Sequence, residues 1–103
     1  GLWHTLVDDP NSYLESSATA GFAYGILKAV HERFLAAAYL PVAYKAVEGL
    51  IGQINDKGEV ERVSVGTGIG DDWDYYRTID ITPMPYGQSL TVLAFTELLV
   101  SYC

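Results

Sequence analysis

The chain has 103 residues, of which 50% are hydrophobic and 18% are charged. This length allows one small domain or a piece of a larger one, and the composition is typical of a globular protein and excludes a disordered one. The formal charge is −7, from 13 acidic and 6 scattered basic residues, and this balance excludes free nucleic acid as a partner.

The sequence contains no segment that could cross a membrane. Its longest uncharged run, residues 81–96, is interrupted by two prolines and is shorter than the ~20 apolar residues that a spanning helix needs. The first residues, Gly-Leu-Trp-His, lack the basic start and the apolar run of a signal peptide. Cys103 is the sole cysteine, so an internal disulfide is excluded, and we expect a cytoplasmic rather than a secreted protein.

The first helix is expected over residues 17–34, after a stretch rich in turn-forming residues. Ser16 or Ser17 is the expected N-cap. The helix is apolar on nearly all sides, which indicates burial over most of its surface. Gly21 and Gly25 weaken the helix intrinsically but would let a neighbouring backbone approach closely.

A second helix is expected from about Pro41, a residue suited to the first helical turn, to about Ile54. It is amphipathic, with one wet face. The apolar stripe opposite that face consists of Val42, Ala43, Ala46, Val47, Leu50, Ile51 and Ile54. The last helix is expected from residues 86–89 to about Ser101, and it is again apolar over most of its circumference, with Glu97 as its one charge.

Between the second and last helices, the sequence predicts a short strand or extended segment over residues 59–65, where Val63 and Val65 alternate with polar residues. A glycine-rich stretch, residues 66–70, leads into a long loop over residues 71–85, and loops of this length are often functional. The glycine-rich stretch lacks the Lys-Ser/Thr ending and the βαβ setting of a phosphate-binding loop. We therefore interpret it as a backbone turn that allows close packing.

The order of elements is a buried helix, an amphipathic helix, a long loop and a second buried helix. This order fits a layered helical ring in which inner and outer helices alternate. One amphipathic helix cannot cover two buried helices, so partner helices are expected outside this chain. The chain starts at Gly1 rather than Met, which also predicts a removed start or a piece of a longer chain. A compact three-helix domain, as a monomer or a dimer, is the alternative.

Three segments carry a resemblance to a known family. They are residues 1–4 (GLWH), residues 12–25 (SYLESSATAGFAYG), and residues 65–70 (VGTGIG) followed by Tyr86-Gly87. Their order and spacing resemble the C-terminal part of unsaturated rhamnogalacturonyl hydrolases, glycoside hydrolase family 105, which is related to family 88. The resemblance covers nearly the whole chain, and it implies an all-α fold in which residues 1–103 form the C-terminal segment of an α/α toroid of six helical hairpins.

The resemblance also implies a reaction, for which no cofactor is expected. An aspartate of the family protonates the double bond of a 4,5-unsaturated uronic acid at the end of a pectin-derived oligosaccharide, water adds, and the hemiketal opens to release the sugar. That aspartate and a pocket-lining stretch with tryptophan and arginine lie upstream in the family and have no counterpart here. We therefore expect the chain to be inactive alone and to need the missing N-terminal part or another copy of the chain.

A different class of function stays open beside this one. The chain could be a non-catalytic helical binding or interaction module that retains the fold of its relatives. No metal site is predicted, because the two histidines and Cys103 lack zinc-ligand spacing and the aspartates of residues 71–74 do not match a calcium loop.

The resemblance and the residue chemistry single out six candidates for substrate binding: Trp3, His4, Glu15, Ser16, Thr19 and Tyr86. A tryptophan can stack on a sugar ring and a histidine can hydrogen-bond hydroxyls or a carboxylate, with core packing and loop capping as their alternative roles. Tyr86 starts the last helix, at the expected pocket end, whereas Tyr75 and Tyr76 are expected to pack.

The other three candidates cluster where the first helix starts. Glu15, Ser16 and Thr19 lie beside backbone N–H groups that have no partner within the helix and can attract a uronate carboxylate. Ordinary helix capping by a serine is the alternative reading of this cluster.

Overall fold

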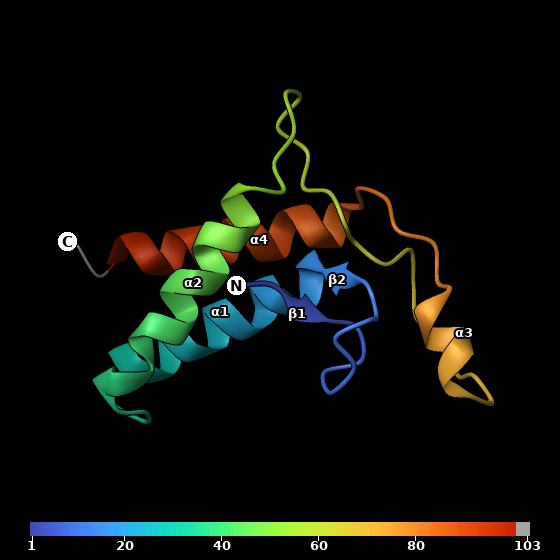
Figure 1. The fold of residues 1–103 in the computed structure, drawn as a ribbon. Coiled ribbons are helices and arrows are strands. Elements are labelled where there is room, and N and C mark those ends of the chain that lie inside the picture. Colours follow the sequence, from blue (N-terminus) through green and yellow to red (C-terminus); the bar gives the residue numbers. More distant parts are fainter. Residues whose placement is uncertain (101–103) are drawn as a thin grey trace.

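A computed structural model describes residues 1–100 of the chain. Cys103 and the predicted helix end at Ser101 lie outside the described residues. The described part is mostly helical, and its elements are β1 (Trp3–His4), β2 (Leu14–Glu15), α1 (Ser16–His31), the 3-10 turn η1 (Ala37–Tyr39), α2 (Leu40–Ile51), α3 (Trp73–Arg77) and α4 (Pro85–Val100) (Figure 1). No helix among residues 1–100 is long and apolar enough to span a bilayer.

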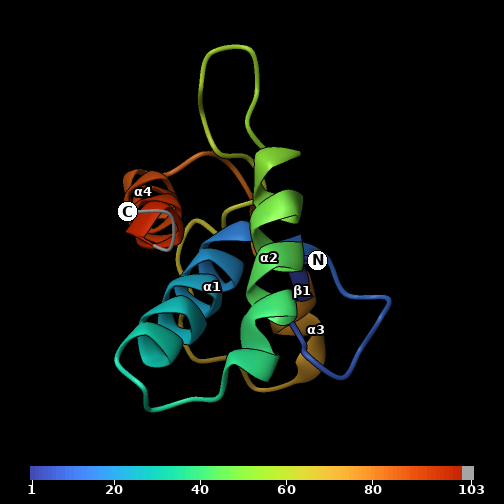
Figure 2. The ribbon, with the colours of Figure 1, turned by 90° about the vertical axis from the view of Figure 1, so that its left-hand side faces the viewer.

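The core forms around α1, which packs against both α2 and α4, whereas α2 and α4 touch each other at few residues (Figure 2). Small side chains let the helices approach closely: Ala23 of α1, Ala46 of α2 and Ala94 of α4 are fully buried and belong to one cluster. Larger residues such as Leu27 and Leu50 fill the remaining space and are also fully buried. Helix α1, which is apolar on nearly all sides, thus occupies the inner position, as its composition indicates.

Helix α1 begins after Glu15, so the prediction of Ser16 or Ser17 as N-cap is wrong. The Glu15 carboxylate accepts a hydrogen bond from the Ala18 N–H at 2.6 Å and takes the role of the cap. Helix α1 ends at His31 instead of residue 34 because Arg33 adopts a left-handed conformation with φ of 65°. The chain therefore turns one helical turn earlier than the apolar pattern indicates.

Helix α2 begins one residue before the expected Pro41 and ends at Ile51 instead of Ile54. Its buried face is narrower than the predicted stripe. Ala43, Ala46, Val47 and Leu50 are buried, but Val42 and Ile51 are exposed. A helix needs only a narrow stripe where it contacts one neighbour, and here α1 is the main neighbour.

No regular strand forms in the segment between α2 and α3, which turns back on itself at residues 55–58 and then runs extended toward α3. Ile54 and Val60 form one antiparallel bridge, and Ser64 and Ile81 form another. Val60 and Val63 are buried and pack on the helices, but Ser64 is buried as well and Val65 is exposed. The predicted alternation of Val63 and Val65 with polar residues is therefore wrong, because the chain leaves the helices after Ser64 and its backbone bridges to Ile81. The two-residue ladder between β1 and β2 pairs Trp3 with Glu15 and was not predicted, because two residues carry too short a pattern.

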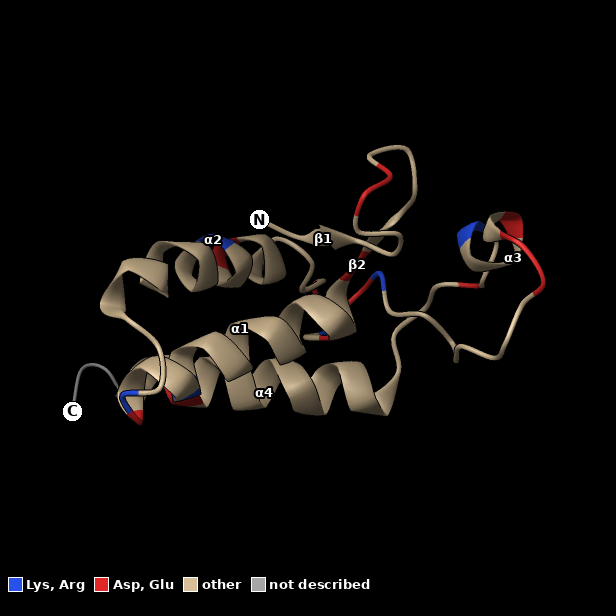
Figure 3. Cartoon of the chain, turned by 90° about the horizontal axis from the view of Figure 1, so that it is seen from below, with Lys and Arg blue, Asp and Glu red and all other residues tan. Residues whose placement is uncertain are grey.

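Apolar side chains on α1 and α4 remain uncovered. Phe22 of α1 is 45% exposed, and Val92, Leu93 and Leu99 of α4 are exposed as well. Figure 3 shows that the charged residues gather in the loops and in α3, while α1 and α4 are largely uncharged. A Cβ atom added at Gly21 or Gly25 would meet nothing within 4 Å, so no described backbone approaches these glycines. These open faces confirm that one amphipathic helix does not cover two apolar ones.

Candidate functional site

A cavity of about 720 Å³ lies where β1, the first turns of α1 and the start of α4 meet α3 and the extended segment. Its size is in the range of about 300–1,000 Å³ that is usual for small-molecule sites. The residues around it are His4, Thr5, Val7, Glu15, Ser17, Ala18, Gly21, Phe22, Ser64, Gly66, Thr67, Tyr76, Tyr86 and Leu90.

Glu15 is the anchor of the cavity wall. Its side chain is buried and its carboxylate accepts three hydrogen bonds. Two come from the start of α1, namely the Ala18 N–H at 2.6 Å and the Ser17 hydroxyl at 2.6 Å, and the third comes from the Ser64 N–H at 3.0 Å. Bonds to an ionised acceptor are stronger than neutral ones, so Glu15 joins the helix start firmly to the extended segment.

Tyr86 reaches the cavity from the first turn of α4. Its hydroxyl donates a hydrogen bond to the Ser64 carbonyl oxygen, and the Ser64 hydroxyl shares a hydrogen bond of 2.7 Å with the Tyr13 hydroxyl. Burial, the charge of Glu15 and the neighbouring Tyr13 raise the pKa of Tyr86 above its ordinary value. The phenol therefore stays protonated at neutral pH and acts as a hydrogen-bond donor.

His4 presents one ring nitrogen for binding. Its Nδ1 lies 2.7 Å from the Ser12 carbonyl oxygen, and a carbonyl can only accept, so Nδ1 carries a proton. In the neutral ring, Nε2 is then the nitrogen with a free lone pair. Since His4 lines the cavity, this nitrogen can accept a hydrogen bond from a ligand hydroxyl.

Ser16 and Thr19 do not line the cavity. Both are fully buried and bonded to the protein itself. The Ser16 hydroxyl donates to the Glu61 carbonyl oxygen at 2.6 Å. The Thr19 hydroxyl donates to the Glu15 carbonyl oxygen at 2.7 Å and accepts from the Trp3 N–H at 2.9 Å. These two residues hold β1, α1 and the extended segment together behind the cavity wall.

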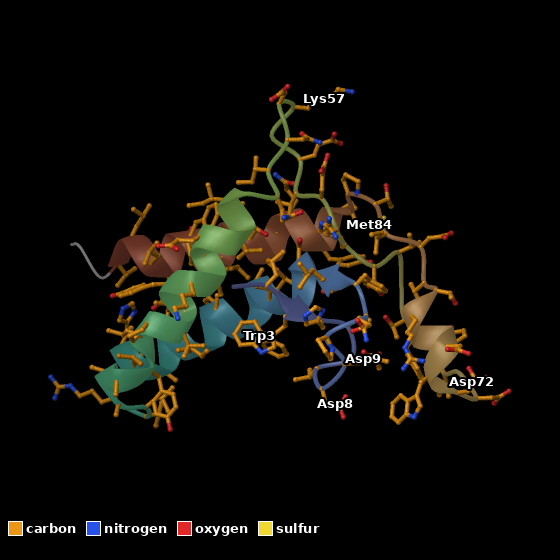
Figure 4. The ribbon with its side chains drawn as sticks, in the orientation of Figure 1. Trp3, Asp8, Asp9, Lys57, Asp72 and Met84 are labelled. Carbon is orange, nitrogen blue, oxygen red and sulfur yellow. The ribbon has the colours of Figure 1, made fainter. Side chains whose placement is uncertain are left out.

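Trp3 lies beside a second, apolar cavity of about 470 Å³, together with Val7 and α1 residues that include Gly21 and Phe22. Its indole packs edge-to-face on the Phe22 ring, with the ring centres 5.1 Å apart and the planes at 74°. Figure 4 shows Trp3 next to α1. Val7, Gly21 and Phe22 line both cavities, so the tryptophan borders the sugar-sized cavity through these neighbours.

Several cavity residues were not among the sequence-based candidates. Ser17, Ser64 and Thr67 contribute hydroxyls, and Tyr76, which was expected to pack, lines the cavity and accepts a hydrogen bond from the Gly70 N–H at 3.1 Å. The one signal in the sequence is position: Thr67 lies within the glycine-rich stretch and Ser64 lies two residues before it.

The glycine-rich stretch packs against one tyrosine. A Cβ atom at Gly70 would overlap the Tyr75 ring, and one at Gly68 would come within 2.6 Å of the Tyr75 hydroxyl. The close packing expected of this stretch is thus confirmed, but residues 66–70 form no regular turn. Tyr75 also packs edge-to-face on Tyr76, which places Tyr76 toward the cavity.

The chemistry of the cavity is that of a hydroxyl-rich and aromatic binding site. Among residues 1–100, no Lys, Arg or Asp lines it, and Glu15 is the one carboxylate in its wall. Within residues 1–100, no group of three His, Cys, Asp or Glu side chains is placed to hold a metal ion. The arrangement can bind a polyhydroxylated molecule, but it provides no aspartate for proton transfer.

Comparison with known proteins gives consistent matches. The family model for Glycosyl Hydrolase Family 88 matches residues 1–102. The unsaturated rhamnogalacturonyl hydrolase YesR of Bacillus subtilis is 31% identical over 100 residues, which are 96% of this chain and 27% of that protein. Two solved structures, described as possible members of the GH105 family from Salmonella enterica and Klebsiella pneumoniae, are 56% identical and superpose with TM-scores of 0.96 and 0.95. Each superposition covers 99% of this chain but 27% of the solved chain, so this chain spans about a quarter of the length of these relatives.

Proposed function

The chain belongs to glycosyl hydrolase family 88, and from this premise we propose that it is the C-terminal part of a hydrolase that releases 4,5-unsaturated uronic acid from rhamnogalacturonan oligosaccharides. The fold agrees with this proposal, because the chain is mostly helical and superposes on GH105 structures over nearly its whole length. The chain spans about a quarter of those relatives, so the activity belongs to a longer assembly.

The observation that carries the proposal is the cavity rich in hydroxyl and aromatic groups at the first turns of α1 and α4. We assign its His4 and Tyr86 to hydrogen bonds with sugar hydroxyls, because one offers a lone pair and the other a phenol. Trp3 offers an aromatic face at the neighbouring apolar cavity, which shares Val7, Gly21 and Phe22 with this one. Glu15 acts through its bonds to Ser17 and Ser64, which hold two cavity hydroxyls in place.

The proton donor of the reaction is proposed to come from outside this chain. The vinyl ether of an unsaturated uronic acid needs a positioned acid, and none of the aspartates in the described part of the chain lines the cavity. We therefore expect this chain alone to be inactive. The single cysteine of the sequence supports a cytoplasmic location for the enzyme.

The uncovered faces of α1 and α4 are the proposed contact with the rest of the enzyme. Gly21 and Gly25 leave a shallow apolar strip on α1, lined also by Trp3, Phe22 and Ile26, into which a further helix can pack closely. Burying apolar surface at about 25 cal/mol per Å² would drive this association.

Reconstitution tests the proposal. The chain is co-expressed with the part of the Klebsiella relative that it does not cover, and the complex is assayed for loss of the double-bond absorbance of an unsaturated rhamnogalacturonan disaccharide. We expect turnover by the complex and none by either piece alone. The variant Tyr86→Phe should reduce turnover, whereas Tyr39→Phe, which removes an exposed hydroxyl with no described hydrogen bond, should not.

Two results would contradict the proposal. A complex that forms but does not turn over substrate would indicate a non-catalytic binding module. Failure of the pieces to associate, with a concentration-dependent mass for the chain alone, would indicate a homodimer that uses the same apolar faces.

A further inference from the structure

Residues 66–79, here called the arm, leave the body of the protein and return to it. At its base, Ser64 and Ile81 form an antiparallel bridge, and the Val65 N–H donates to the Asp80 carbonyl oxygen at 2.9 Å. Beyond this base, the arm carries the glycine-rich stretch and α3, and Figure 1 shows it extending away from the three long helices. Its remaining backbone hydrogen bonds are internal, such as that from the Thr78 N–H to the Tyr75 carbonyl oxygen.

Arg77 joins the arm to the N-terminal loop. Its Nε donates to Oδ2 of Asp9 at 2.9 Å, and its Nη1 donates to Oδ1 of Asp74 within the arm, also at 2.9 Å. Among residues 1–100, the bond to Asp9 is the single ionic or hydrogen-bonded contact between the arm and the rest of the chain. In Figure 4, Asp9 lies on the side of its loop nearer α3, while the neighbouring Asp8 points away.

Hydrogen bonds through Ser12 connect Asp9 to His4. The Asp9 carboxylate also accepts from the Asn11 N–H at 2.9 Å, and its carbonyl oxygen accepts from the Ser12 hydroxyl at 2.7 Å. The carbonyl oxygen of Ser12 in turn accepts the proton of His4 Nδ1. Asp9 therefore belongs to a hydrogen-bonded turn over residues 9–12, and the same turn orients the His4 ring through the Ser12 carbonyl oxygen.

The contact connects two walls of one cavity. The arm contributes Gly66, Thr67 and Tyr76 to the cavity, and the N-terminal segment contributes His4 and Val7. Because these walls come from segments about 60–70 positions apart in sequence, the ion pair between Arg77 and Asp9 is what limits their separation at the outer end.

We propose that Arg77 is a positioning residue whose ion pair with Asp9 latches the arm, one wall of the cavity, to the N-terminal loop and sets how far the cavity mouth opens. The pair is partly exposed to solvent, and exposed ion pairs are weak and screened by salt. The latch therefore opens readily, and the arm behaves as a lid that admits and releases the ligand. The Asn11 N–H and the Arg77 guanidinium hold the pKa of Asp9 below its usual value, so the latch is ionised at neutral pH.

Hydrogen exchange on the chain tests the latch without any ligand. Asp9→Asn and Arg77→Gln are each expected to speed amide exchange of residues 66–79 by about twofold to fivefold, as loss of a weak surface pair would do, and to leave α1 and α4 unchanged. Arg77→Gln also removes the bond to Asp74, so the double variant should be no faster than Arg77→Gln alone, because that variant already lacks the pair with Asp9. Asp8→Asn is the matched control, since it removes a neighbouring exposed charge that has no described partner, and it should exchange like the wild type.

Salt provides a readout that a general loss of stability would not give. The wild type at high salt should resemble Asp9→Asn, whereas Asp9→Asn itself should be insensitive to salt. Unchanged exchange in residues 66–79 would overturn the proposal. Faster exchange throughout the helices with a lower Tm would also overturn it, because Arg77 would then be an ordinary stabilising residue.

The effect on ligand entry rests on the proposed function and is measured separately. In the reconstituted enzyme, Arg77→Gln should raise KM for the unsaturated disaccharide about threefold with kcat unchanged, as expected for a residue that affects binding alone. An unchanged KM beside faster arm exchange would overturn the role in ligand entry. Absence of turnover in the reconstituted wild type would count against the proposed function and not against the latch, which the exchange experiment decides.

Discussion

The Oε1 atom of Glu15 accepts a hydrogen bond from the Ser64 N–H at 3.0 Å, although the two residues are 49 positions apart in the chain. The same carboxylate caps α1 through Ala18. One buried side chain thus holds the helix start and the extended segment at a fixed distance, and the cavity lies between them.

Replacing Glu15 by Gln should destabilise the chain by about 2–3 kcal/mol, because the amide removes the negative charge and turns an NH₂ group toward the donors of one carboxylate oxygen, at the least the Ala18 N–H. Urea unfolding followed by circular dichroism measures this change. Glu48→Gln is the control, since Glu48 is exposed on α2 and has no described side-chain bond. Equal midpoints for the two variants would show that the Glu15 bonds contribute nothing.

A second charged contact joins the end of α1 to α4. The Nδ1 atom of His31 lies 2.6 Å from Oε1 of Glu97, and Glu97 is buried within an otherwise uncharged helix. Glu97→Gln should lower the free energy of unfolding by about 1–3 kcal/mol, the usual cost of breaking a buried charged hydrogen bond. Glu32→Gln, which breaks the exposed pair with Lys28, should leave the unfolding midpoint nearly unchanged, and a larger effect there would contradict this ranking.

Two helical glycines should respond to alanine in opposite directions. Nothing lies within 4 Å of a Cβ at Gly21, so Gly21→Ala should stabilise the isolated chain by about 0.5–1 kcal/mol through a better helix propensity. A Cβ at Gly87 would overlap the buried Val63 side chain, so Gly87→Ala should destabilise by about 1–3 kcal/mol. Thermal unfolding of both variants checks the two signs, and a stable Gly87→Ala variant would mean that α4 can shift away from Val63.

The latch should have a defined dependence on pH. The pKa of Asp9 is lowered from its ordinary value of 3.8 by the Asn11 N–H and by Arg77. A lowered folded-state pKa means that the interaction is complete above pH 3.8 and is lost as the pH falls through the still lower folded value. The NMR shift of the Arg77 Nε–H should therefore stay constant down to about pH 3.8 and change below it, with no such transition in Asp9→Asn. A transition near neutral pH would contradict the assignment.

Tyr86 should ionise above the ordinary pKa of 10.0, because burial and the Glu15 charge oppose a phenolate. Its contribution to stability is therefore complete below pH 10.0 and is lost as the pH rises through the higher folded value. Ultraviolet titration of the tyrosines should show a late-ionising phenol that disappears in Tyr86→Phe and persists in Tyr39→Phe. Loss of an early-ionising phenol in Tyr86→Phe would show that Tyr86 is not buried beside Glu15 in solution.

Much of the fold was readable from the sequence because helices depend on local patterns. The apolar periodicity predicted the helices near residues 17–34, 41–54 and 86–101, and each is present with ends that differ by a few residues among the described positions. The same patterns predicted two helices with more apolar surface than the chain can cover, and the exposed faces of α1 and α4 agree.

The site was predicted less well because a sequence does not show where a hydroxyl points. Ser16, Ser17 and Thr19 are neighbours with similar chemistry, yet Ser17 lines the cavity while the other two are buried behind its wall. A helix turns by about 100° per residue, so adjacent side chains face different surroundings. The sequence did not predict Ser64 as a cavity residue, because its position depends on hydrogen bonds with Glu15 and Tyr86, which are distant in sequence.

The sequence by itself determined the helical class, the family and the shortage of covering surface, since these follow from composition, period and motif order. The tertiary structure alone decided which residues form the cavity and that Arg77 reaches Asp9, 68 positions away. Contacts of this kind depend on how the chain closes its loops, and local preferences hold no information about which distant partner each side chain meets.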